Sequence, residues 1–262
     1  MEEEEEIDSD ESSVPTPMRY GYQSEESTPL LQILPMGLSQ ETFSHLISNR
    51  SLFLYRFGCS ALISFYLGWR ITKVGMVFFW WFTSWNAILC ALYFYSALII
   101  SYGNATRRHL NFHKYLCCAT ASISPFVSVI FWLFLVRQIP KELWETELLD
   151  LIIAHSFNSI LPIADLIICK TYFGFQHILA PNVILWLYQA TLLAVHASNF
   201  HSGGNVWPYP FIGDLNGPGP IKWGVMGFLG LGFSLIVTLF SILMVCLIRY
   251  RNFKQAPYIR LT

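Results

Sequence analysis

Six long apolar segments constrain the fold of this chain more than any other feature of its sequence. Each is close to the roughly 20 residues that a helix needs to cross a bilayer. The segments cover residues 51–69, 77–100, 115–136, 148–169, 178–198 and 223–248. Hydrophobic residues make up 54% of the chain and charged residues only 13%, a balance that excludes an ordinary water-exposed surface. The sequence therefore predicts an all-α fold, a polytopic membrane bundle of six transmembrane helices.

The two ends of the chain differ from this apolar middle in charge. Ten of the 17 acidic residues lie before residue 27, among few large apolar side chains, so this segment cannot bury enough surface to offset the entropy of ordering. We expect residues 1–38 to form a disordered acidic cytosolic tail, residues 39–250 the six-helix domain, and residues 251–262 a basic cytosolic tail. No basic stripe with interleaved aromatic residues is present, and we expect no nucleic-acid partner.

The lysine and arginine residues flanking the apolar segments predict the orientation of the helices. With the N-terminus in the cytosol, ten of these bases lie on the cytosolic side and five on the opposite side, which favours both termini in the cytosol. The ten are Arg50, Arg56, Arg107, Arg108, Lys114, Lys170, Arg249, Arg251, Lys254 and Arg260, and the five are Arg70, Lys73, Arg137, Lys141 and Lys222. Because Arg56 lies one turn inside the first apolar segment, we expect its side chain to extend back toward the membrane surface.

Polar residues inside two of the apolar segments are the candidates for chemistry. His155, Asn158 and Asp165 lie in the fourth segment at spacings that place them on one helix face, and an ionisable group in hydrocarbon is costly enough to indicate a function. Thr83 in the second segment and His155 lie at a similar depth from the non-cytosolic side, about 9 and about 10 Å by the helical rise. A hydroxyl and an imidazole at one depth can act as nucleophile and general base. Asn158 can orient His155 or donate to an oxyanion, so we interpret Thr83, His155 and Asn158 as candidate catalytic residues.

The same polar residues also fit roles without catalysis. Thr83 can bond its own preceding backbone carbonyl, and Asp165 can pair with Lys170, as in a non-enzymatic protein held together by interhelical hydrogen bonds. His196 in the fifth segment can approach His155 as a bis-imidazole haem site, and a transporter is a further alternative. The six cysteines include no C-x-x-C pair, and no histidine has metal-ligand spacing, so we expect no metal and no cofactor.

An ordered series of short motifs resembles a known family of membrane proteins. The series covers residues 51–250 and is similar to the rolling stone and androgen-induced-protein superfamily of six-helix membrane proteins, more closely to the rolling stone branch. The motifs are Phe82-Thr83-Ser84-Trp85, Ala154-His155-Ser156-Phe157-Asn158-Ser159, Ala164-Asp165, Gly203-Gly204, Trp207-Pro208-Tyr209-Pro210-Phe211 and Asn216-Gly217-Pro218-Gly219.

The two branches of that superfamily imply different functions. The androgen-induced branch implies an intramembrane threonine hydrolase whose lipid substrates are fatty acid esters of hydroxy fatty acids, with its threonine nucleophile at Thr83. The catalytic position of that branch's histidine-x-x-histidine pattern is Asn158 in this chain, and His155 matches the first histidine. The rolling stone branch implies the alternative, a non-enzymatic membrane protein in cell-surface interaction or muscle-cell fusion.

A separate pattern in the acidic tail concerns location. Glu26, Leu30 and Leu31, in the run Glu-Ser-Thr-Pro-Leu-Leu, resemble the acidic dileucine signal that clathrin adaptors read for delivery to lysosomes or vacuoles. The pattern predicts a clathrin adaptor as partner. We therefore expect an integral protein of the endomembrane system, in the lysosome or vacuole or the plasma membrane.

The predicted orientation has a direct test. Asn49-Arg50-Ser51 and Asn104-Ala105-Thr106 are formal glycosylation sequons on the side that we place in the cytosol. Neither asparagine should carry a glycan, so the gel mobility of the protein from a secretory-pathway host should not change on treatment with an N-glycosidase. A shift that disappears in the Asn49→Gln or Asn104→Gln variant would reverse the orientation.

Overall fold

The computed structural model describes residues 47–103, 105–139, 141–169, 173–197 and 220–255, and within them every regular element is a helix. The α-helices are α1 (Asn49–Val74), α2 (Phe82–Ser101), α3 (Arg107–Ile130), α4 (Lys141–Ile152), α5 (Asn158–Ile168), α6 (Leu179–Ala197) and α8 (Pro220–Gln255). Shorter helical segments are η1 (Gly75–Trp80), η2 (Phe131–Leu135), η3 (Val136–Gln138), η4 (Ile153–Phe157) and η5 (Phe175–His177). The predicted all-α class is thus confirmed for these residues.

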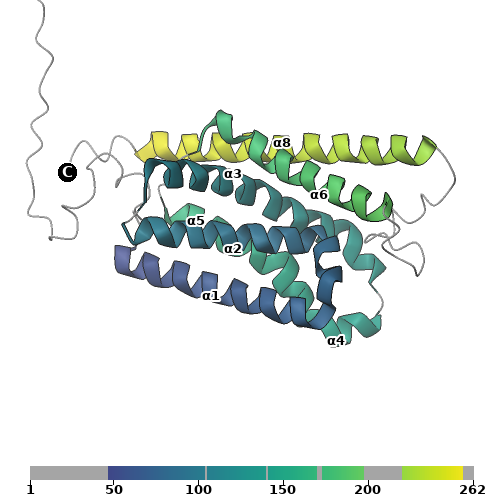
Figure 1. Ribbon diagram of the computed structural model, residues 1–262. Helices are drawn as coiled ribbons and strands as arrows, with labels where there is room; N and C mark the ends of the chain where they lie inside the picture. Colours follow the sequence, from purple (N-terminus) through teal and green to yellow (C-terminus); the bar gives the residue numbers. More distant parts are fainter. Residues whose placement is uncertain (1–46, 104, 140, 170–172, 198–219, 256–262) are drawn as a thin grey trace, which may run out of the picture. The chain divides into compact units, whose positions relative to one another are not determined.

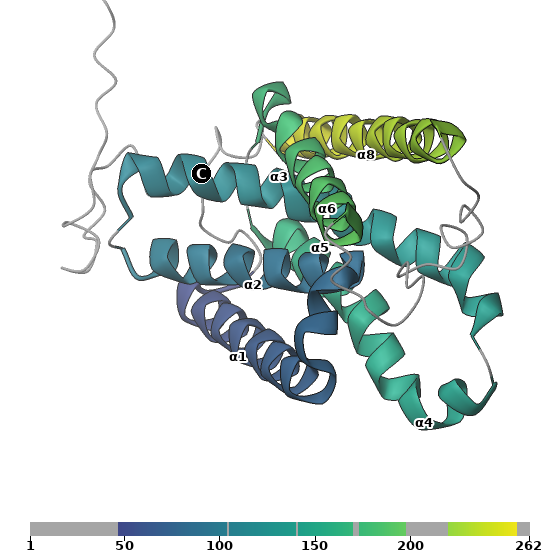
Figure 2. The ribbon, with the colours of Figure 1, turned by 45° about the vertical axis from the view of Figure 1, so that its right-hand side comes forward.

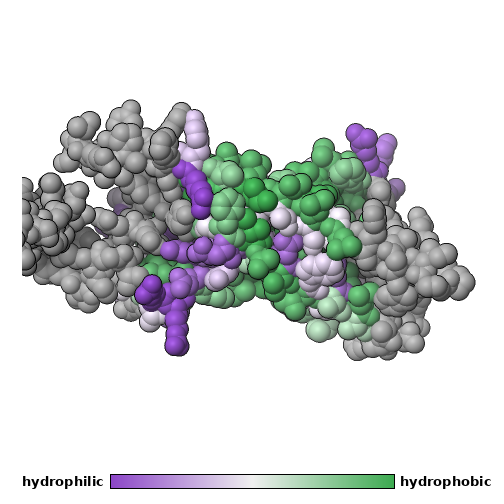
Figure 3. Space-filling model, turned by 90° about the horizontal axis from the view of Figure 1, so that it is seen from above, coloured by the Kyte–Doolittle hydropathy of each residue, from purple (hydrophilic) through white to green (hydrophobic). Residues whose placement is uncertain are grey.

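The described helices provide six stretches long and apolar enough to cross a membrane. Their surfaces agree with this, because large apolar side chains such as Phe65, Leu149 and Leu179 are 76%, 71% and 72% exposed. Apolar area of this kind is stable against lipid and unfavourable against water. Figure 3 shows one face on which apolar residues fill the middle and hydrophilic residues gather toward the two ends. These are the features of an integral membrane protein.

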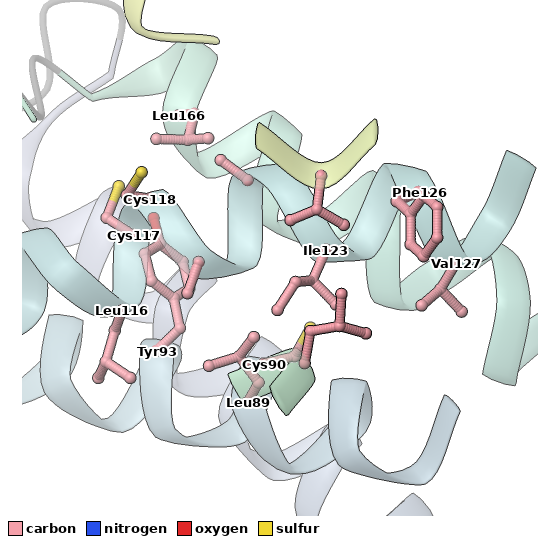
Figure 4. Close-up of a cluster of buried hydrophobic side chains, with 14 of the residues drawn as sticks. Leu89, Cys90, Tyr93, Leu116, Cys117, Cys118, Ile123, Phe126, Val127 and Leu166 are labelled. Atoms are coloured by element: carbon pink, nitrogen blue, oxygen red, sulfur yellow. The ribbon is translucent and has the colours of Figure 1, made fainter. Parts of the chain in front are cut away.

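Helix α3 is the central element of the bundle. It contacts α2, α5, α6 and α8, while α1 packs on the far side of α2 (Figures 1 and 2). The core between α2 and α3 is built from small and aromatic side chains, with Cys90, Tyr93, Cys117 and Ile123 all fully buried (Figure 4). Small residues allow two helices to approach closely, which is how membrane helices gain packing energy without help from water.

Several helix boundaries differ from the apolar segments. Helix α3 begins at Arg107, eight residues before the segment predicted from hydropathy, because Thr106 caps it: its hydroxyl accepts the His109 N–H at 3.3 Å. The second segment is interrupted at Trp81, whose extended backbone separates the 3₁₀ segment η1 from α2. In the fourth segment the π-helical η4 separates α4 from α5. Hydropathy reports the length of a span and is insensitive to such breaks.

A buried ion pair joins the first and fourth apolar segments. The Arg56 guanidinium donates two hydrogen bonds to the Asp165 carboxylate, Nε to Oδ1 at 3.0 Å and Nη2 to Oδ2 at 3.1 Å. The two side chains are only 1% and 0% exposed. The expectation that Arg56 extends to the membrane surface is therefore wrong. The described partner of Asp165 is Arg56, and Lys170 lies outside the described residues. Arg56 turns inward because a bidentate carboxylate compensates its charge.

Neighbouring groups complete the bonding of this pair. The Tyr93 hydroxyl donates to Asp165 Oδ2 at 2.6 Å, and Arg56 Nη1 donates to Ser101 Oγ at 2.8 Å. Arg56 Nη2 also donates to Cys169 Sγ at 3.0 Å. The cluster ties α1, α2 and α5 together at the end of the bundle where α1 begins.

Breaking one half of the pair should be costly. In Asp165→Asn the buried Arg56 charge loses its counter-ion, and we expect a loss of about 3–5 kcal/mol of stability, read as a lower thermal midpoint of the detergent-solubilised protein. Arg56→Met combined with Asp165→Leu should be less destabilising than Asp165→Asn because no unpaired charge remains.

The matched control is the exposed ion pair between Lys73 and Glu147, whose N–O distance is 2.5 Å with side chains 38% and 25% exposed. Lys73→Gln should change stability by no more than about 1 kcal/mol. Equal losses in Lys73→Gln and Asp165→Asn would show that burial of the Arg56 pair adds nothing.

Candidate active site

A cavity lies where the start of α2 meets α3, η4, α6 and α8. Its volume, counted as the space open to the centres of water-sized spheres, is about 80 Å³. Most of its wall is apolar, with Phe126, Leu185 and Phe233 among the lining residues. The polar groups on the wall come from Thr83, His155, Tyr188 and Gln189. An apolar pocket with a few convergent polar groups is the usual form of a site for a small organic ligand.

Thr83 is the second residue of α2 and is half-buried. Its hydroxyl makes no hydrogen bond within the described part of the chain. Two backbone carbonyls shortly before Thr83 in sequence accept hydrogen bonds from other side chains. The Trp85 indole donates to the Phe79 carbonyl at 2.8 Å, and the Tyr188 hydroxyl donates to the Trp80 carbonyl at 2.7 Å. The Thr83 hydroxyl bonds neither of these carbonyls.

His155 is held by contacts from the neighbouring helix. Its ring lies face to face on Phe131, with the ring centroids 3.4 Å apart and the planes 2° from parallel. The Ser128 hydroxyl donates to the His155 backbone carbonyl. Both rings of the stack belong to π-helical segments, Phe131 to η2 and His155 to η4. Such segments are rare and occur often at functional sites.

The His155 ring has no acidic partner among the described residues. Its Nδ1 atom is buried and makes no hydrogen bond there. Asp150, five residues before His155, accepts instead from Arg70 at 2.5 Å and from Tyr66 at 3.2 Å. A carboxylate that orients the imidazole, as in a catalytic triad, is therefore absent among residues 47–169 as described. The stack on Phe131 fixes the ring instead.

Asn158 lies outside the cavity wall. It is 2% exposed, and its Nδ2 donates to the Ala154 carbonyl at 3.0 Å. The Asn158 backbone carbonyl accepts from Cys90 Sγ at 3.2 Å. Asn158 therefore faces α2 whereas the His155 ring lies on Phe131. The two residues diverge because the π-helical turn of η4 lies between them and changes the register of the helix. The structure brings together Thr83 and His155 and leaves Asn158 in the packing between helices.

Three residues of the site are missing from the sequence-based set. The Tyr188 hydroxyl donates to the Trp80 carbonyl, Phe131 stacks on the imidazole, and Gln189 adds a carboxamide to the wall. Gln189 carries a signal that sequence reasoning could have used, because it is a polar residue in the middle of an apolar segment. The aromatic residues carry none, since the chain contains 21 phenylalanines and 13 tyrosines.

Other predicted residues lie outside the described part of the chain. These include the sorting signal at Glu26, Leu30 and Leu31, and the motifs between Gly203 and Gly219. The backbone of His196 belongs to α6, but its side chain is not among those described. The haem alternative for His155 and His196 therefore stays a prediction.

Comparison of the chain with models of known protein families, with curated proteins and with solved structures found no match.

The position of Thr83 on a cavity wall has a chemical test. In a Cys246→Ser background, which removes the one exposed cysteine of the described residues, Thr83→Cys should react with a small methanethiosulfonate reagent at least about tenfold faster than Ala87→Cys. Ala87 lies one turn further along α2 and is 0% exposed, so it reports the reactivity of a buried position. Equal rates would mean that the cavity does not admit a small molecule to Thr83.

Proposed function

We propose that this chain is a multi-pass membrane enzyme that hydrolyses lipid esters, with Thr83 as the nucleophile and His155 as the general base. The observation that carries the proposal is that one largely apolar cavity joins the Thr83 side chain to the His155 side chain. The cavity wall suits the aliphatic part of a lipid, and its few polar groups suit an ester. The unbonded Thr83 hydroxyl supports the proposal, because a nucleophile must not be tied to its own backbone.

The reaction has two steps. Thr83 Oγ1 attacks the ester carbonyl carbon while the His155 ring accepts the hydroxyl proton, and the alcohol leaves with that proton as the carbonyl–oxygen bond breaks. Thr83 then carries the acyl group. Water, deprotonated by His155, attacks this acyl-threonine, which releases the fatty acid and restores the hydroxyl. Proton transfer requires the ring nitrogen to come within about 3 Å of Oγ1, directly or through one water.

The start of α2 supplies a source of oxyanion stabilisation that replaces Asn158. The N–H groups of Ser84 and Trp85 both donate to the Trp81 carbonyl, at 3.0 and 3.3 Å. Thr83 therefore lies within the first turn of α2. The helix dipole is positive at this end of α2. A negative charge that develops on an ester oxygen beside Thr83 is therefore favoured at this position. We assign Asn158 to packing.

The substrate class and location come from the sequence patterns. The resemblance to the androgen-induced branch supports fatty acid esters of hydroxy fatty acids as substrates, and it aligns that branch's threonine with Thr83. The dileucine pattern at Glu26, Leu30 and Leu31 supports recognition by a clathrin adaptor and an endomembrane location with both termini in the cytosol. The substrate class, the adaptor and the location are thus parts of the proposal that rest on sequence patterns alone.

Turnover of a purified sample tests the proposal. With an ester of a hydroxy fatty acid in detergent micelles, Thr83→Ala and His155→Ala should each lower kcat by about 10²–10⁴-fold, because each removes a participant in proton transfer or attack. A fluorophosphonate that labels reactive hydroxyl groups should mark wild type and not Thr83→Ala.

The matched control is Asn158→Ala, which removes a buried polar group of the same helix without touching the cavity wall. It should lower thermal stability and leave kcat within about threefold of wild type. Equal turnover by wild type and Thr83→Ala would exclude the enzyme. The outcome would then favour a non-enzymatic membrane protein, for which the missing acidic partner of His155 is the supporting observation.

A further inference from the structure

We propose that Gln189 is the polar anchor of the cavity and selects ligands that carry a hydroxyl group on an aliphatic chain. This inference deepens the proposed function and rests on the cavity being its substrate site. Gln189 lies on α6, lines the same cavity as Thr83 and His155, and is half-buried. Its carboxamide makes no hydrogen bond with the described residues. A carboxamide left unbonded on an apolar wall is costly, and a ligand that bonds it recovers that cost.

The carboxamide lies against the backbone of α8. A Cβ atom built at Gly230 would lie 2.5 Å from Gln189 Oε1 and 2.9 Å from Nε2, so the carboxamide rests directly on the glycine. Only a residue without a side chain permits this contact. The glycine is therefore part of the site, because it lets a polar group lie flat where a larger residue would push it away.

The neighbour of Gln189 connects it to the candidate nucleophile. Tyr188 packs on Phe82 with ring centroids 4.8 Å apart and on Trp85 at 5.7 Å, and these two residues flank Thr83 and Ser84 in α2. Its hydroxyl also donates to the Trp80 carbonyl. This part of α6 is thus packed against the start of α2, which places the backbone of Gln189 beside the helix that carries Thr83.

The chemistry of the carboxamide indicates the ligand group. Its oxygen accepts a hydrogen bond and its NH₂ group donates two, so the best partner is a neutral group that both donates and accepts. An aliphatic hydroxyl is the smallest such group, and the surrounding phenylalanine and leucine side chains suit the chain that carries it. A plain hydrocarbon fits the same walls but leaves the carboxamide unbonded.

Photolabelling of the full-length protein in detergent tests this selection. The probes are an octanol and an octane that carry the same alkyl diazirine, and the labelled cavity peptides are quantified by mass spectrometry. In Gln189→Leu we expect the half-saturating concentration of the alcohol to rise by about fivefold to tenfold, the value of one lost hydrogen bond. The octane probe should label wild type and Gln189→Leu equally.

Two glycines of α8 provide a matched pair. Gly230→Ala should reproduce the effect of Gln189→Leu, because its Cβ displaces the carboxamide from the wall. In Gly232→Ala the half-saturating concentration of the alcohol probe should equal that of wild type, since no atom lies within 4 Å of a Cβ built there. The anchor is supported if alcohol binding weakens in Gly230→Ala as it does in Gln189→Leu and is unchanged in Gly232→Ala. An alcohol affinity that is unchanged in Gln189→Leu, or reduced equally for both probes, overturns it.

The experiment separates this inference from the proposed hydrolysis because it needs no turnover. Alcohol selectivity in wild type, combined with equal ester turnover by wild type and Thr83→Ala, supports the anchor and rejects the enzyme. Esterase activity that depends on Thr83, combined with equal labelling by alcohol and alkane in wild type, supports the enzyme and overturns the role of Gln189.

Discussion

The buried pairing of Arg56 with Asp165 is the constraint on which the rest of the bundle depends. A guanidinium inside an apolar bundle is tolerated only when its charge and its donors are compensated, and Asp165, Ser101 and Cys169 together do this. The contacts fix the depth of α5 relative to α1 and α2. Since η4 continues directly into α5, the same contacts determine where His155 reaches the cavity.

The candidate site is arranged by contacts among helices rather than by residues of one helix. Thr83 and His155 lie on one cavity wall, and three other side chains of the bundle contact their surroundings. Trp85 and Tyr188 bond the Phe79 and Trp80 carbonyls, and Phe131 stacks on the imidazole. The proposed nucleophile and base need such positioning by groups that take no part in the chemistry.

Much of the fold and half of the site follow from the sequence. Hydropathy gives the six spans. The depth argument places Thr83 and His155 at one level, and both line the cavity, although the break at Trp81 and the π-helical η4 depart from the straight helix that the argument assumes. The role of Asn158 could not be obtained this way, since the π-helical turn of η4 changes the helix register between His155 and Asn158. The inward orientation of the Arg56 side chain could not be predicted from the sequence either. Its partner Asp165 lies 109 residues away, and only packing of distant segments reveals such a pair.

The bond from Tyr188 to the Trp80 carbonyl spans 108 residues of sequence, and this has a consequence for biosynthesis. Until α6 has left the ribosome and docked, that carbonyl has no tyrosine donor, and the cavity lacks the part of its wall that Tyr188 and Gln189 form. The space beside Thr83 is therefore not enclosed before the fifth span has joined the bundle.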